Sequence, residues 1–224
     1  MSKLAYKDIP LLLKQIPSCP LSLYYKGDSS LLKSKSVTIV GTRSITEYGE
    51  WVIRYLLESF LKDLNISVVS GLARGVDGYV HRVCLERNIN TIAIVPGSMT
   101  SYIPKENKKL FKEIQRRGLV LAEFSKDTEF NRKMFVLRNR LLAGMSKVTV
   151  VIEAGLDSGS LITAGLALEY NRDVYVIPGD LRNKMSQGCN ILAKQGAEII
   201  TCLSDFEEIF GVQNGQTSMN VQGK

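Results

Sequence analysis

Short runs of Val, Ile and Leu recur along most of the chain and constrain its fold more than any other feature. Most of these runs are continuously apolar, without alternation of apolar and polar residues. This is typical of parallel strands that are covered by helices on both faces. We therefore predict strands at 37–40, 67–70, 91–95, 119–122, 148–152 and 174–177, with a weaker one at 198–201.

Segments with helical spacing lie between these runs. They predict one helix between the first two strands and further helices near 76–84, 110–114, 160–170 and 204–210. The first predicted helix carries on one face the apolar residues Trp51, Val52, Tyr55, Leu56 and Phe60. Alternation of strand and helix predicts an α/β fold, a doubly wound and mostly parallel sheet with helices on both faces.

The chain divides into three parts. Residues 1–35 are interpreted as a lead-in segment packed on the core, with a short helix near 7–15 and an extended piece at 23–25. Residues 36–211 form the main domain, and residues 212–224, rich in Gln, Asn, Gly and Ser, are expected to be disordered because they have little to bury.

Composition excludes several classes of protein. No apolar run reaches the roughly 18 residues of a membrane span, and the apolar stretch near Pro10 is too short for a secretory signal, so we expect a cytoplasmic protein. The four cysteines are scattered and His81 is the single histidine, which predicts neither a zinc site nor another metal or cofactor.

The charge of the chain favours a polyanionic partner. The net charge is +7 and the isoelectric point about 9.2. Basic residues interleaved with aromatic ones suit single-stranded nucleic acid, because phosphates and unstacked bases are met side by side. One segment has this pattern, with Phe130, Arg132, Lys133, Phe135, Arg138 and Arg140. A solvated charge cluster remains the alternative for Arg138-Asn139-Arg140.

Gly-rich or polar turns follow nearly every predicted strand. In open α/β sheets, ligands bind beyond the carboxyl ends of the strands, and small residues with free amides there attract anions. Any single turn is explained by turn chemistry alone, but their recurrence at one sheet edge favours a phosphate-lined crevice. The turns begin at Gly41, Ser70, Pro96, Glu123, Glu153 and Pro178.

Gly41-Thr42-Arg43 is the most specific of these turns. It combines a glycine for close approach, a hydroxyl donor and an arginine whose planar fork suits phosphate. Ser158-Gly159-Ser160 has two open interpretations, phosphate contact or capping of the next helix. Asp77 and His81, four residues apart, favour a structural hydrogen bond over catalysis because no nucleophile accompanies them.

At this point the motifs resemble those of one family, over residues from about 6 to 210. They are Val40-Gly41-Thr42-Arg43, Ser70-Gly71-Leu72-Ala73-Arg74-Gly75-Val76-Asp77 with His81, Pro104 to Asn107, Phe135 with Arg138-Asn139-Arg140, Glu153-Ala154, Ser158 to Ala164, Pro178-Gly179 and Gly188-Cys189-Asn190. In this order they are similar to the DNA-processing protein DprA (Smf) family.

The resemblance implies an extended Rossmann-like fold that binds single-stranded DNA, protects incoming DNA in natural transformation and assists loading of the RecA recombinase. It also implies a homodimer without enzymatic activity. Motifs and resemblance together assign to DNA binding Gly41, Thr42, Arg43, Ser70, Gly71, Gly97, Asn107, Arg132, Lys133, Phe135, Arg138, Asn139, Arg140, Ser158, Gly159 and Ser160.

The chain departs from the family pattern at Ile103, where the family has Tyr before Pro, and at Val136, where it has Pro. We also expect no room for the winged-helix domain that many members carry. An alternative function is a nucleotide-binding sensor or a nucleotide-hydrolysing enzyme of the lysine-decarboxylase-like group. It would use Glu123 or Glu153 at the strand ends, although the glycine-rich signature of that group is missing.

Overall fold

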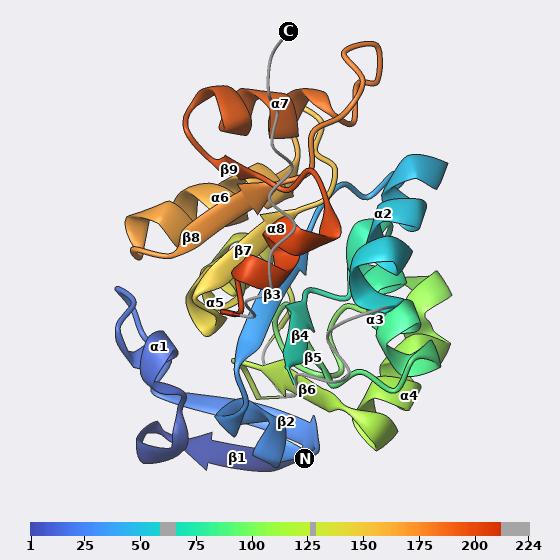
Figure 1. The fold of residues 1–224 in the computed structure, drawn as a ribbon. Coiled ribbons are helices and arrows are strands. Elements are labelled where there is room, and N and C mark those ends of the chain that lie inside the picture. The colour runs from blue at the N-terminus through green and yellow to red at the C-terminus, as the bar shows by residue number, and fades with distance from the viewer. Residues whose placement is uncertain (59–65, 126–128, 212–224) are drawn as a thin grey trace, which may run out of the picture.

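A single sheet organises the computed structural model, which describes residues 1–58, 66–125 and 129–211. Within these residues nine strands run in the order β1-β2-β6-β5-β4-β3-β7-β8-β9 (Figure 1). Neighbours from β6 to β9 are parallel, whereas β2 is antiparallel to both β1 and β6. The strands are β1 (Ser2–Ala5), β2 (Ser22–Gly27), β3 (Ser36–Val40), β4 (Ser67–Ser70), β5 (Thr91–Val95), β6 (Leu119–Ala122), β7 (Val148–Val151), β8 (Asp173–Val176) and β9 (Glu198–Ile199).

Helices cover both faces of this sheet, so the predicted doubly wound α/β fold is confirmed. Core residues of α1, α5, α6 and α7 pack on one face, and those of α2, α3 and α8 on the other, while α4 packs beside β5 and β6. The helices are α1 (Leu11–Lys14), α2 (Glu47–Glu58), α3 (Val76–Glu86), α4 (Lys108–Arg117), α5 (Lys133–Met145), α6 (Gly159–Glu169), α7 (Gln187–Lys194) and α8 (Leu203–Glu208). None of the described helices is long and apolar enough to cross a membrane.

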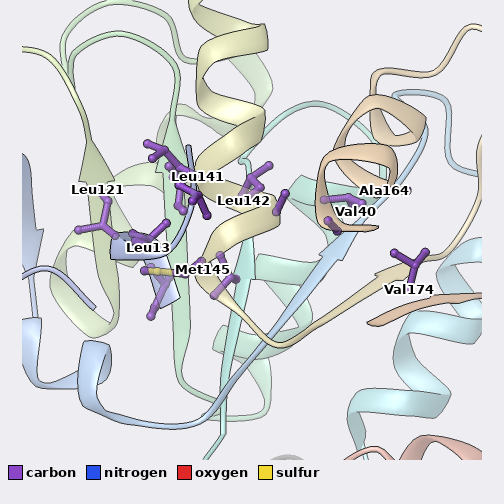
Figure 2. Packing of buried hydrophobic residues seen from close by; sticks show 14 of the residues in the cluster. Leu13, Val40, Leu121, Leu141, Leu142, Met145, Ala164 and Val174 are labelled. Carbon is purple, nitrogen blue, oxygen red and sulfur yellow. The ribbon is translucent and has the colours of Figure 1, made fainter. Parts of the chain in front are cut away.

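The largest core cluster lies under α5. Figure 2 shows Leu141, Leu142 and Met145 of this helix among side chains from the strands and from α1. Leu13 of α1 is fully buried there. Since burial of one such side chain contributes about 1.5–3 kcal/mol, the beginning of the chain adds to the stability of the main sheet.

The lead-in segment extends the sheet itself. The extended piece predicted at 23–25 is part of β2, which pairs with β6, and the helix expected near 7–15 is the short α1. The outer strand β1 was not predicted, because its one buried residue, Leu4, leaves no readable pattern. The division into domains remains a prediction, and residues 212–224 lie outside the described part.

The prediction for the first helix is wrong in part. Val52 and Leu56 are buried together with Ile53 and Leu57, but Trp51 is 58% and Tyr55 39% exposed. Trp51 and Tyr55 precede the buried pairs by one position, which turns them about 100° away around the helix. Their rings stack on each other with centroids 5.1 Å apart. Phe60 lies outside the described residues.

His81 has a structural role, with a different partner from the one expected. Its Nδ1 lies 2.7 Å from the Thr91 hydroxyl, in full burial, instead of pairing with Asp77. Burial lowers the pKa of His81 to about 3, because the charged imidazolium is disfavoured away from water. The single histidine is therefore neutral and part of the core.

Candidate nucleic-acid interface

A cleft of about 680 Å³ opens at the carboxyl ends of β3 and β7. From β3 the chain builds the sheet first through β4 toward β6 and later through β7 toward β9, so the strand order reverses between β3 and β7. This reversal is the point where open α/β sheets bind ligands. Five segments line the cleft: residues 40–44 at the end of β3, Ala73 with Asp77, one side of α5, residues within 155–163 and residues within 184–187.

The Gly41-Thr42-Arg43 turn is fixed on both sides. Thr42 donates its backbone N–H to Glu153 O at 2.7 Å and accepts from Val76 N at 3.0 Å. A side chain at Gly41 would meet Val76 Cγ2 at 2.6 Å and Glu153 O at 2.9 Å, so this position has space for glycine alone. The turn is a preformed wall of the cleft.

Arg43 is the exposed cation of this wall. Among the described residues it forms no ion pair, and its guanidinium lies 5.2 Å from the ring centroid of Phe135. A cation over an aromatic face is attracted by the ring quadrupole. A cation and an aromatic ring thus stand next to each other at the mouth of the cleft.

Phe135 belongs to a cluster of three rings. Its ring centroid is 5.3 Å from that of Tyr102 and 5.5 Å from that of Phe130, both edge-on. Tyr102 and Phe130 are nearly parallel and 5.5 Å apart. The sequence pattern had singled out Phe130 and Phe135, but not Tyr102, which comes from the distant 100–103 loop.

Ser158-Gly159-Ser160 forms the start of α6 at the opposite wall. Ser158 accepts from Ser160 N at 3.4 Å and caps the helix, and the two hydroxyls lie 2.7 Å apart. The capping interpretation is therefore supported. Gly159, Ser160 and Thr163 of α6 line the cleft, and a helix N-terminus favours a bound anion.

Arg138 lies at the inner end of the cleft, but it is only 6% exposed. Its Nη1 donates to Gly71 O at 2.6 Å and to Ile94 O at 2.8 Å. Burial raises the pKa of the nearby Asp77 carboxyl, while the positive charge of Arg138 acts against this shift. This geometry favours a role in bracing the strand ends, and a direct phosphate contact by Arg138 stays a prediction.

The remaining predicted residues are spread more widely. Asn139 lines the cleft and donates to Gly159 O at 3.4 Å. Arg140 forms an ion pair with Glu123, and the exposed Arg132 and Lys133 stand at the start of α5. Unlike Asn139, the three basic residues Arg132, Lys133 and Arg140 do not line the cleft.

The other residues that the sequence assigned to DNA binding include two buried polar side chains. Ser70 donates to Ile39 O at 2.7 Å, and Asn107 donates to Leu72 O at 3.1 Å and to Ala73 O at 2.8 Å, so both hold the backbone. Gly71 lines a smaller hollow beside the cleft. Gly97 adopts a φ of 70°, in the region that favours glycine.

Sequence reasoning missed the loop after β8. Lys184, Met185 and Gln187 line the cleft, the Thr42 hydroxyl donates to Met185 Sδ at 3.1 Å, and Lys184 is exposed. The one available signal was the Pro178-Gly179-Asp180 turn that starts this loop. Among the described residues no group of three or more His, Cys, Asp or Glu side chains could hold a metal ion.

The doubly wound sheet, with an open cleft at its switch point and an exposed arginine beside aromatic rings, defines a Rossmann-like ligand-binding protein. More narrowly, the chain belongs to the DNA recombination-mediator protein A family, whose family model matches residues 2–211. This agrees with the DprA (Smf) resemblance of the motifs.

The matched relatives align with most of this chain, whereas the share of each relative that this chain matches differs from one relative to the next. Protein Smf of Synechocystis is 39% identical over 197 residues, 86% of this chain but 49% of that protein. The X-ray structure of DprA from Streptococcus pneumoniae has a TM-score of 0.87 and 33% identity, covering 92% of this chain and 73% of that one.

A structure of DNA processing protein A from Helicobacter pylori, described by its single-stranded DNA binding mode, has a TM-score of 0.84 and 33% identity. It covers 93% of this chain, and this chain covers 94% of it. The similarity therefore extends over nearly the whole of both chains.

Proposed function

We propose that this protein binds single-stranded DNA in the cleft, without sequence preference, as a DNA-processing protein of natural transformation. The observation that carries the proposal is the exposed Arg43 guanidinium over the Phe135 ring at the cleft mouth. The pair offers one phosphate contact and one stacking surface at adjacent positions, as sequence-tolerant single-strand binding requires. The similarity to the Helicobacter pylori protein supports it.

The roles within the cleft divide by exposure. Arg43 and Lys184 supply cations, and the start of α6 at Gly159 supplies a backbone donor to phosphate oxygens. Phe135 stacks on a base. Buried Arg138 holds the strand ends behind them, and Arg132 with Lys133 extends the positive surface along the start of α5.

Two further roles rest on family membership. The protein protects incoming DNA and assists RecA loading, and it acts as a homodimer in the cytoplasm. Because the chain spans 49% of its Synechocystis relative, these roles are proposed for the part of the family fold present here.

The enzymatic alternative has less support. Glu153 accepts from Thr46 N at 2.9 Å and from the Thr46 hydroxyl at 2.6 Å, so it caps the region before α2. Glu123 is held by Arg140. Both carboxylates that were candidates for catalysis thus have structural partners, and we do not propose turnover.

The proposal is tested by fluorescence anisotropy with single- and double-stranded DNA over a salt series. With about three to five phosphate contacts, the slope of log affinity against log salt is expected to be roughly −2 to −3.5 for single strands. A slope near zero, or a preference for duplex, would contradict the proposal.

Arg43→Ala is expected to lower single-strand affinity about 5-fold at 0.1 M salt and to flatten the slope by about 0.7, the share of one phosphate. Arg182→Ala is the matched control, because it removes the same charge from an exposed turn outside the cleft. Equal affinity of the Arg43 and Arg182 variants, with normal circular dichroism, would remove Arg43 from the site.

A further inference from the structure

A strongly basic face of α4 lies outside the cleft. At about 100° per residue, Lys108, Lys109 and Lys112 fall within an arc of about 100° around the helix. All three side chains are exposed. The apolar side of α4, with buried Ile114, faces away from this arc. We call these three residues the lysine face.

The acidic and arginine residues of α4 have partners other than these lysines. The one acidic residue of α4, Glu113, pairs with Arg116 at 2.9 Å, and Arg117 donates to Leu85 O and Asn88. Within the parts of the chain that the structure describes, none of the three ammonium groups lies in an ion pair. Like charges so close together repel one another, and a polyanion relieves this repulsion.

A smaller hollow adjoins the cleft and includes residues of the segment that precedes α4. Arg43 and Phe135 line both the cleft and the hollow, and Tyr102, Ile103 and Pro104 form the far wall of the hollow. A 3-10 turn, Lys105–Asn107, follows at once and leads into α4. The Asn107 side chain fastens this turn to the carbonyls of Leu72 and Ala73.

Tyr102 offers a stacking surface along this route. Its side chain is 41% exposed, and its ring is held parallel to Phe130. Every nucleobase has a face that can stack on such a ring. Arginine, aromatic rings and lysines therefore follow one another from the cleft to the helix.

We propose that a single strand bound in the cleft continues across Tyr102 and lays its phosphates on the lysine face of α4. The inference rests on the proposed function and deepens it, since it assigns a second contact region and a direction to the bound strand. Short strands occupy the cleft, and only longer strands reach the lysines.

The test compares oligothymidines of about 6 and about 25 nucleotides by fluorescence anisotropy at several salt concentrations. The variant carries Lys108→Gln, Lys109→Gln and Lys112→Gln, because glutamine keeps helix propensity while removing charge. We expect about 10- to 100-fold weaker binding of the long strand at 0.1 M salt, and a slope flatter by about 2, from about 0.7 per phosphate. The short strand should bind as it does to the unmodified protein.

A matched control removes the same charge elsewhere. Lys33, Lys35 and Lys194 are exposed and lie outside α4, so their change to Gln lowers the net charge equally. This control should keep at least most of the long-strand affinity. Tyr102→Ala should likewise weaken the long strand more than the short one.

Different results separate the two proposals. Equal losses for the short and long strands, or equal losses for the α4 variant and its control, would overturn the path along α4. So would an unmodified protein that binds both lengths equally. If the unmodified protein binds neither length, the proposed function itself fails. A loss confined to duplex DNA would assign the lysine face to another nucleic-acid form and overturn the inference.

Discussion

At the scale of single residues, Arg138 shows that a charged residue beside the cleft can support the site without being exposed to a ligand. Both Arg138 and the nearby Asp77 are buried. The Arg138 guanidinium joins the ends of β4 and β5 through the carbonyls of Gly71 and Ile94. No side chain fits at Gly71, because a Cβ there would overlap the guanidinium. A charged residue in a basic motif is thus used as internal scaffolding.

Arg138→Ala is expected to destabilise the fold by about 2–5 kcal/mol, because it leaves the buried carbonyls of Gly71 and Ile94 without their charged donor. Urea unfolding followed by circular dichroism measures this. Arg132→Ala, in an exposed position just before the same helix, should leave the midpoint unchanged. If both variants unfold alike and only DNA binding differs, Arg138 is a contact residue and not a brace.

The buried His81 predicts a pH dependence. Its pKa of about 3 in the folded protein lies below the ordinary value of 6.5, so only the unfolded chain takes up this proton between these values. Stability is then present above about pH 6.5 and falls by up to about 1.4 kcal/mol per pH unit below it.

Comparison with His81→Gln isolates this contribution, because carboxylates such as Asp77 titrate in both proteins. The difference in unfolding free energy between the two should shrink steadily as pH falls from 6.5 to 4.5. A constant difference would mean that His81 is protonated in the folded state.

At the scale of elements, the sequence predicted the strands and helices whose buried residues recur in a regular pattern. It missed residues that come together only through the folding of distant segments. Continuous runs such as 91–95 became strands because helices cover both of their sides. The exposed Trp51 was misplaced because apolar character alone does not distinguish two adjacent helical faces. Tyr102 and Lys184 reach the site from distant loops, and no local pattern brings them together with Arg43.

The start of α6 offers a test between capping and phosphate contact. Ser158→Ala should cost about 1 kcal/mol in unfolding free energy, because the cap is lost. Ser158→Asp should keep the stability, since Asp caps equally well, but should weaken binding of single-stranded DNA by placing a negative charge at the cleft wall. Unchanged binding by the Asp variant would limit Ser158 to its capping role.

At the scale of the whole molecule, the first 35 residues extend the edge of the sheet and pack on its core. β2 covers the edge of β6, and Leu13 and Leu23 are almost fully buried in the main cluster. Without them, β6 becomes an open edge of unpaired backbone groups next to exposed apolar surface, a combination that promotes aggregation.

Removal of residues 1–35 is therefore expected to give a protein that aggregates or unfolds without cooperativity. Removal of residues 1–5 takes away only the outermost strand and should leave a cooperative transition with a lower midpoint. Size-exclusion chromatography and thermal unfolding distinguish the two. A monodisperse, cooperatively folding protein without residues 1–35 would show that the main domain is self-sufficient.

The contact between Arg43 and Phe135 has a consequence for the thermodynamics of binding. In the free protein the ring face is already occupied by the guanidinium. A base that stacks there displaces the cation, and a phosphate that draws the cation away uncovers the ring. Under the proposed function, binding at this point is an exchange of partners, so a base and a phosphate carried on one strand are expected to assist each other more than the same groups supplied separately.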